Sequence, residues 1–200
     1  MTILQMPPRT AVRRAGLVDV PAVVRLFAAP EHPAVDWDQA QRAMRLMLAH
    51  YALEEGQVWV AERADGTLLA AAVWLPPGTE SPHTRFNGLF ARELTAPLPQ
   101  EPVLPTALKR AKPDTPHWTV VTVCTPDDSE AWDRRVVSDL LSPGLHTVDE
   151  EAADAVAVTL SPRHMDPLRP LGFRAPHQVP FAEGAGVWLA TRHPVPKLAA

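Results

Sequence analysis

The sequence is poor in the features that define several common protein classes. Cys124 is its one cysteine, so no intramolecular disulfide can form and a reducing compartment is expected. The formal net charge is −4, which argues against a general nucleic-acid binder or a binder of anionic membranes. The longest apolar run, Leu68 to Leu75, is far shorter than the roughly 18 residues of a membrane span. Residues 1–8 also lack the basic start and apolar centre of a signal peptide. The sequence therefore predicts a soluble, cytoplasmic protein.

Motifs for metal binding and for hydrolysis are missing as well. The eight histidines show neither an H-x-x-H nor an H-E-x-x-H spacing, so no metal site is expected. A G-x-S-x-G motif does not occur, and a serine hydrolase is therefore not supported.

What the chain does contain is typical of one globular domain. Its 200 residues are 46% hydrophobic and 21% charged. We assign residues 10–194 to a single domain, with residues 1–9 and 195–200 as tails. Many of the 23 prolines gather in residues 79–116, which excludes a central strand there. This stretch is predicted to be a flap over the sheet, with Phe86, Leu89 and Phe90 on its underside.

The first half of the domain shows two amphipathic helices and a hairpin. Residues 10–15 are predicted as a strand, and the sequence Asp19-Val20-Pro21 begins a helix. A second helix is expected from a cap at Asp36 to a stop at Gly56. Strands at 57–61 and 68–75 are joined through an Asp-Gly pair, which is a strong hairpin signal.

The second half alternates strands and helices. Residues 118–124 are predicted as a buried strand, with Trp118, Val120, Thr122 and Cys124 on one face. Asp128 or Ser129 is expected to cap the following helix, which carries Trp132. A strand at 155–160, a short helix at 162–168 and a strand at 187–191 complete the order. The fold class predicted is α/β, with a mixed twisted sheet of six to seven strands flanked by about four helices.

This order of elements, together with several short sequence segments, resembles the GNAT acyltransferase superfamily, and most of all its puromycin N-acetyltransferase-like members. The segments are those at 12–26, 58–61, 71–74, 116–127 and 161–173. The resemblance implies a GNAT-like fold and an acetyl-CoA-dependent N-acetyltransferase acting on a small amine. It implies a slot for the pantetheine arm between the strands at 118–124 and 155–160. It also implies a homodimer through the C-terminal strands around Val187-Trp188-Leu189.

The loop that holds acetyl-CoA in such enzymes departs from the family pattern here. That pattern is Q/R-x-x-G-x-G/A, whose glycines let backbone N–H groups approach the pyrophosphate. Residues 126–135 contain no glycine, and Glu130 and Trp132 stand where glycines belong. Only weak acetyl-CoA binding is therefore expected. The cofactor-binding residues that the resemblance implies are Val123, Thr125, Ser129, Arg134 and Arg135.

The usual acid of the family is also lost. The tyrosine that protonates the leaving thiolate corresponds to Leu168, and His164, in place of a common asparagine, is the replacement candidate. The predicted pocket for a small-molecule ligand consists of Trp59, Trp74, Trp118 and Cys124. A nucleophilic role for this thiol would require a nearby base and a lowered pKa.

Three functions remain open at this point. The first is an acetyl-CoA-dependent N-acetyltransferase with an altered loop. The second is a non-catalytic GNAT-fold protein that binds a ligand or partner. The third is an enzyme that uses the same pocket for other chemistry, since a fold alone does not fix a function.

Overall fold

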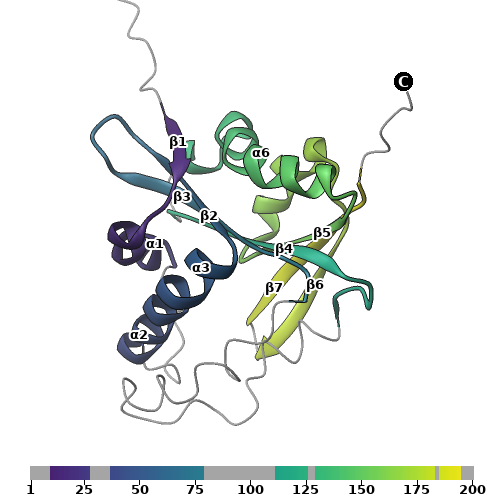
Figure 1. Ribbon diagram of the computed structural model, residues 1–200, viewed down its shortest axis with the longest axis horizontal. Coiled ribbons are helices and arrows are strands. Elements are labelled where there is room, and N and C mark those ends of the chain that lie inside the picture. The colour runs from purple at the N-terminus through teal and green to yellow at the C-terminus, as the bar shows by residue number, and fades with distance from the viewer. Residues whose placement is uncertain (1–9, 28–36, 79–110, 126–128, 183–184, 195–200) are drawn as a thin grey trace, which may run out of the picture.

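A seven-stranded mixed sheet forms the centre of the protein. The computed structural model describes residues 10–27, 37–78, 111–125, 129–182 and 185–194 (Figure 1). In spatial order the strands are β1 (Ala11–Arg14), β2 (Gln57–Glu62), β3 (Leu68–Leu75), β4 (His117–Cys124), β5 (Asp154–Thr159), β7 (Ala185–Arg192) and β6 (Arg174–Ala182). The β4–β5 pair is parallel and the other pairs are antiparallel. The predicted α/β class and mixed sheet are confirmed. Of the predicted flap, residues 79–116, the structure describes only 111–116. Both predicted tails lie outside the described residues.

Helices cover both faces of this sheet (Figure 1). One face carries α1 (Val20–Leu26) and a long helix made of α2 (Trp37–Met47), a π-helical turn η2 (Leu48–Ala52) and α3 (Leu53–Glu55). The other face carries α6 (Arg134–Glu150) and the 3-10 helix η4 (Pro162–Leu171). Short 3-10 turns η1 (Leu17–Asp19) and η3 (Glu130–Trp132) precede α1 and α6.

Side-chain alternation along β4 divides the core in two, as predicted. Trp118, Val120 and Cys124 belong to the cluster beneath α6. Val123 is buried in the cluster beneath α1. Period-two alternation places successive side chains on opposite faces, so β4 presents its last residue, Cys124, to the α6 side.

The predicted hairpin forms between β2 and β3. Asp65 Oδ1 accepts a hydrogen bond from the Thr67 amide at 2.9 Å. Gly66 has a φ of 83°, which a residue without a Cβ adopts at no steric cost. The helix expected at Asp19-Val20-Pro21 is also present, with Asp19 at its N-cap position. The Asp19 carboxylate, however, binds the Arg13 guanidinium with two bonds of 2.8 Å.

Strand β6 is absent from the order predicted by the sequence. Pro176 and Pro180 interrupt it, and proline is typical of turns and edges because it cannot donate to a ladder. The sheet order places β6 at the edge beyond β7, where unpaired positions are tolerated. Strand β7 lies between β5 and β6, so the segment Val187-Trp188-Leu189 is inside the sheet and not at its edge. The homodimer stays a prediction.

The start of α6 differs from the prediction. Asp133, not Ser129, caps the helix, and its side chain accepts a hydrogen bond from the Arg135 amide at 2.8 Å. Trp132 therefore lies before the helix, in η3. Asp128 lies outside the described residues. Residues 130–132 form the separate 3-10 turn η3, so the α-helix begins after that turn.

The predicted separation of β4 and β5 is also wrong over most of their length. Every residue of β5 pairs with β4, from His117–Asp154 to Thr122–Thr159. The strands part only beyond that last pair, where Val123 and Cys124 have no partner in β5. Across the part of the chain that the structure describes, no helix has the length and apolar character to cross a membrane. The cytoplasmic location stays a prediction.

Candidate functional site

The point where β4 and β5 part is occupied by three side chains from three elements. Cys124 ends β4, Trp132 ends η3, and His164 lies in the first turn of η4. The Cys124 Sγ and His164 Nε2 atoms are 3.4 Å apart, within hydrogen-bond distance for sulfur. The Trp132 and His164 rings lie 4.5 Å apart between centroids, tilted by 44°. The structure thus brings together Cys124 and His164, which the sequence singled out separately.

The environment of His164 keeps its ring neutral. Desolvation by burial lowers the pKa of His164 from its ordinary value of 6.5. Its Nδ1 atom is buried and has no hydrogen-bond partner among the described residues. The lowered pKa leaves His164 in the unprotonated form that can accept a proton, and its Nε2 atom is the one that contacts Cys124. Its predicted role as an acid stays a prediction.

This burial makes a pH-dependent contribution to stability that can be measured. The unfolded state binds the His164 proton more tightly, so the contribution is fully present above about pH 6.5 and is lost as the pH falls through that value toward the lower folded-state pKa. We expect His164→Asn to flatten the dependence of the unfolding free energy on pH below about 6.5. Urea unfolding at several pH values measures it. An unchanged slope in His164→Asn would contradict the argument.

The turn η3, in the segment that precedes α6, is held by an ion pair between Arg63 and Glu130. The Arg63 guanidinium donates to Glu130 Oε2 at 3.0 Å from Nε and 2.8 Å from Nη2. Thr10 Oγ1 donates to Glu130 Oε1 at 3.3 Å. Ala131 is fully buried in the core beneath α6. Glu130 therefore acts as an anchor for η3, and Arg63 offsets part of its negative charge.

A hollow of about 710 Å³ lies between the first turn of α6, η4 and the start of β6. Arg134 of the first turn of α6, Arg169 of η4 and Arg174 of β6 all line it. Asp166 is the one acidic residue in its lining, and it lies 3.6 Å from Arg169 Nε. The hollow is thus positively charged and adjoins the N-terminus of a 17-residue helix, where the helix dipole favours anions.

Sequence reasoning identified Arg134 but missed the two arginines that face it. Arg169 lies in the proline-containing helix η4, and Arg174 begins β6, a strand that the pattern did not predict, so no local signal joined them to Arg134. Of the other predicted cofactor residues, Val123 is buried on the opposite face. Thr125 donates to Leu69 O, and Ser129 and Arg135 are exposed.

The predicted pocket tryptophans lie on the α6 face of the sheet and are largely covered. Trp74 is fully buried, and the Cβ of any residue at 144 would come within 2.5 Å of its ring. Trp118 Nε1 donates to Glu151 Oε2 at 2.8 Å. Trp59 is half-buried, and its Nε1 donates to Gln57 Oε1 at 3.2 Å. The described conformation therefore uses these rings in packing, and their role around a ligand stays a prediction.

Solved structures with the same arrangement of strands and helices extend over nearly the whole chain. A histone-acetyltransferase-related acetyltransferase from Corynebacterium glutamicum is 21% identical, with a TM-score of 0.62, covering 97% of this chain and 100% of that one. The chain has the GNAT fold. A GCN5-related N-acetyltransferase from Kribbella flavida is 17% identical, with a TM-score of 0.50, covering 92% of this chain and 97% of its own.

The GNAT fold also occurs in a protein with a different description. The C-terminal condensation domain of Ebony, solved in complex with β-alanyl-dopamine, is 10% identical with a TM-score of 0.54; the match covers 94% of this chain and 100% of that domain. No protein-family model matches the chain, and a search of the curated proteins finds no match. At these identities the likeness shows the fold, and the function has to be argued from the residues.

Proposed function

We propose that this protein is an acetyl-CoA-dependent N-acetyltransferase that acts on a small amine and holds the phosphates of acetyl-CoA through arginines in place of a glycine loop. The observation that carries the proposal is the hollow shared by Arg134, Arg169 and Arg174. Planar guanidinium groups bind phosphate oxygens through paired, charge-assisted hydrogen bonds. GNAT-fold acetyltransferases are among the solved structures similar to this chain.

The residues present fit a polyanionic ligand better than the sequence alone indicated. Of the described acidic residues in this segment, Glu130 is paired with Arg63, and the Asp133 carboxylate accepts a hydrogen bond from a backbone amide. Three guanidinium groups, against one carboxylate, line the adjoining hollow. The lost glycines still remove backbone donors, so binding remains weaker than a glycine loop would give.

The chemistry in this proposal belongs to the Cys124–His164 pair. Acetyl-CoA, when bound, supplies an activated acetyl thioester. His164, kept neutral by burial, can accept a proton from an attacking group at its Nε2 atom. Leu168, at the usual position of the tyrosine acid, is fully buried and carries no proton to donate. Trp132 covers one side of the imidazole and helps to exclude water from it.

Binding of coenzyme A to arginine variants tests the proposal. We expect the natural protein to bind it with a Kd of about 0.1–1 mM at low salt. Each phosphate–arginine interaction contributes roughly 1.5 kcal/mol or more, so Arg134→Ala and Arg169→Ala should each weaken binding at least about tenfold. ³¹P NMR titration measures this. Arg135→Ala, on the same helix turn as Arg134 but outside the lining of the hollow, is the matched control and should have little effect. Pantetheine, which has no phosphate, should bind weakly to every variant, and equal binding of pantetheine and coenzyme A would contradict the proposal.

A second candidate is a GNAT-fold protein that binds a ligand or partner without catalysis. The specific observation in its favour is that β4 and β5 pair through Thr122–Thr159, and Cys124, Trp132 and His164 fill the short gap beyond. Such packing leaves little space between β4 and β5, where the resemblance implies a slot for the pantetheine arm. Binding of coenzyme A with no acetylation of a panel of primary amines, followed by mass spectrometry, would favour this second function.

A further inference from the structure

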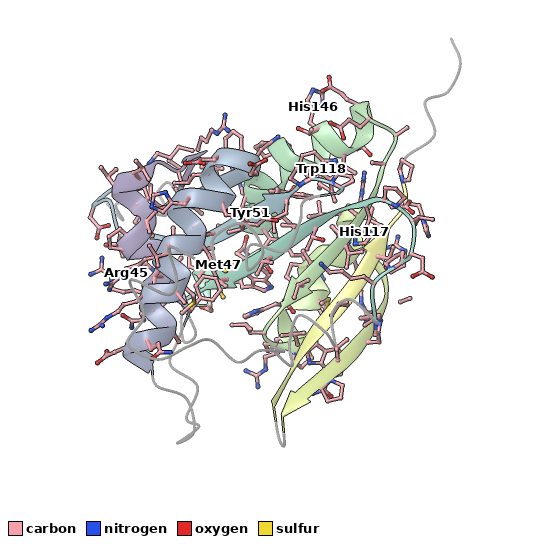
Figure 2. All side chains as sticks on the ribbon, turned by 60° about the horizontal axis from the view of Figure 1, so that its bottom comes forward. Arg45, Met47, Tyr51, His117, Trp118 and His146 are labelled. Carbon is pink, nitrogen blue, oxygen red and sulfur yellow. The ribbon has the colours of Figure 1, made fainter. Side chains whose placement is uncertain are left out.

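A second hollow lies at the other end of β4, away from the Cys124–His164 pair. It encloses about 510 Å³ between the long helix, the end of β3 and the start of β4. This size is within the range of pockets that take small molecules, roughly 300–1,000 Å³. Met47 and Tyr51 point toward it from the helix, and Figure 2 shows both on the side that faces the sheet.

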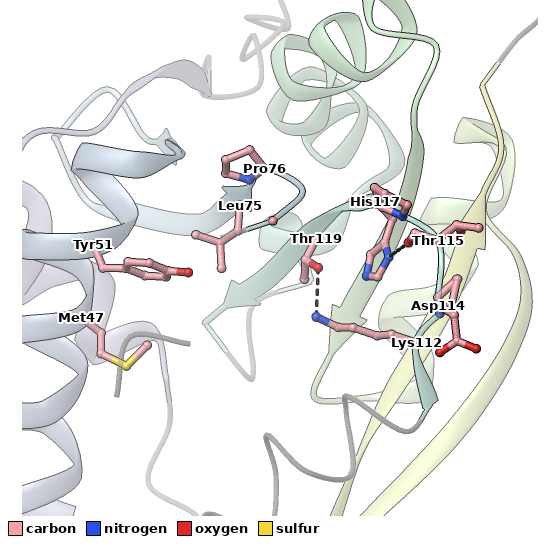
Figure 3. Close-up of a pocket in the computed structure, with 12 residues that line it drawn as sticks. Met47, Tyr51, Leu75, Pro76, Lys112, Asp114, Thr115, His117 and Thr119 are labelled. Atoms are coloured by element: carbon pink, nitrogen blue, oxygen red, sulfur yellow. Dashed lines mark hydrogen bonds between the residues drawn. The ribbon is translucent and has the colours of Figure 1, made fainter. Parts of the chain in front are cut away.

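One cation reaches into this hollow without a counter-ion. Lys112 Nζ donates to Thr119 Oγ1 at 2.9 Å, which is a neutral partner. Within the described ranges, no carboxylate forms an ion pair with Lys112; the carboxylate of nearby Asp114 is exposed and points away (Figure 3). Desolvation by burial lowers the pKa of Lys112. A partly buried ammonium with a single neutral acceptor retains donors for an anion.

The opposite wall combines a hydroxyl with apolar surface. The Tyr51 hydroxyl points into the hollow from across it, facing Thr119 and Lys112 (Figure 3). Tyr51 lies in the π-helical turn η2, and such turns occur frequently at functional sites. Leu75 and Pro76 line the same wall. The hollow therefore has a charged end and an apolar end.

We propose that this hollow is a binding site for a small carboxylate with an aromatic or branched aliphatic group. The carboxylate would bind Lys112 Nζ beside Thr119 Oγ1, and the apolar group would lie against Met47, Leu75 and the ring of Tyr51. A carboxylate fits better than a phosphate ester, because Lys112 is the one ammonium group in the lining, and Met47, Leu75 and Pro76 supply apolar surface beside it. This site is independent of the arginine hollow and of the proposed acetyl transfer.

The experiment uses phenylacetate and its neutral counterpart phenylacetamide, which share shape and differ in charge. Ligand-observed NMR titration should show phenylacetate binding to the natural protein and phenylacetamide binding at least about tenfold more weakly. Lys112→Met should remove that preference, and Lys112→Arg should keep most of it. Leu75→Trp, which fills the apolar end and leaves Lys112 in place, should weaken both ligands. Coenzyme A binding, which belongs to the other hollow, should be unchanged in Lys112→Met.

A second readout applies even where a variant fails to fold. The chain has three lysines, so modification of Lys112 by an amine reagent can be followed by mass spectrometry with Lys109 and Lys197 as internal references. Phenylacetate should protect Lys112 selectively, and phenylacetamide should not. Equal affinity for the two probes, binding that survives Lys112→Met, preference for inorganic phosphate over phenylacetate, or no protection of Lys112 would each overturn the proposal.

Discussion

Replacing Asp149 with alanine is expected to lower the free energy of unfolding by about 3 kcal/mol. Asp149, on α6, accepts two hydrogen bonds of 2.8 Å from the Arg192 guanidinium of β7. Arg192 is only 5% exposed, and its Nε also donates to Leu171 O at the end of η4 at 2.9 Å. Removing the carboxylate leaves a buried cation with one neutral acceptor, and such losses cost roughly 3–5 kcal/mol. The lower end applies because a third of the Asp149 side chain is exposed.

Urea unfolding measures this change, with an unaltered m-value as the sign that the transition stays cooperative. Arg192→Met combined with Asp149→Ala is the matched control, because it removes the unpaired charge and should recover part of the lost stability. A loss below about 1 kcal/mol in Asp149→Ala would mean that water compensates Arg192 and that the pair does not hold η4 against α6.

Gly144→Ala is the second change with a large expected effect, a loss of about 2 kcal/mol. In an exposed helix this substitution stabilises by roughly 0.5–1 kcal/mol. Here an added Cβ would lie 2.2 Å from Cε2 and 2.3 Å from Nε1 of Trp74, distances that real Cβ atoms do not adopt. Trp74 is fully buried between β3 and α6, so its indole cannot move aside without opening the core.

Thermal or urea unfolding of the natural protein, Gly144→Ala, Trp74→Leu and the double variant separates the clash with Trp74 from the helix propensity of alanine. In a Trp74→Leu background the clash is gone, and Gly144→Ala should then be neutral or stabilising. If Gly144→Ala stabilises the natural protein instead, Trp74 has room to move and its predicted place around a ligand regains support. The cycle therefore also decides whether this tryptophan is a core residue.

Elements specified by neighbouring residues were predictable. The Asp65-Gly66 pair forms its turn through a local hydrogen bond and a positive φ, so the hairpin follows from a few residues. Alternation along β4 likewise predicted which side chains face α6. In both cases the signal and the structure involve the same short segment.

Features that depend on neighbours in the sheet were not predictable. Strand β6 contains two prolines, and only its place at an edge makes them tolerable. The pairing of β4 with all of β5 was missed because the resemblance implied a separation there. The first residue of α6 was missed because several acidic residues precede it, and only the folded turn η3 shows that Asp133 is the cap.

By itself, the sequence determined the α/β class, the order of most elements and the absence of glycine from residues 126–135, because these depend on local periodicity, turn residues and composition. Only the tertiary structure decided which residues form sites. Cys124 and His164 are 40 positions apart, and Arg134, Arg169 and Arg174 come from three separate elements. The lack of a described counter-ion for Lys112 is likewise a property of its surroundings. Proximity, burial and electrostatic environment arise from packing between distant segments, and no short stretch of sequence records them.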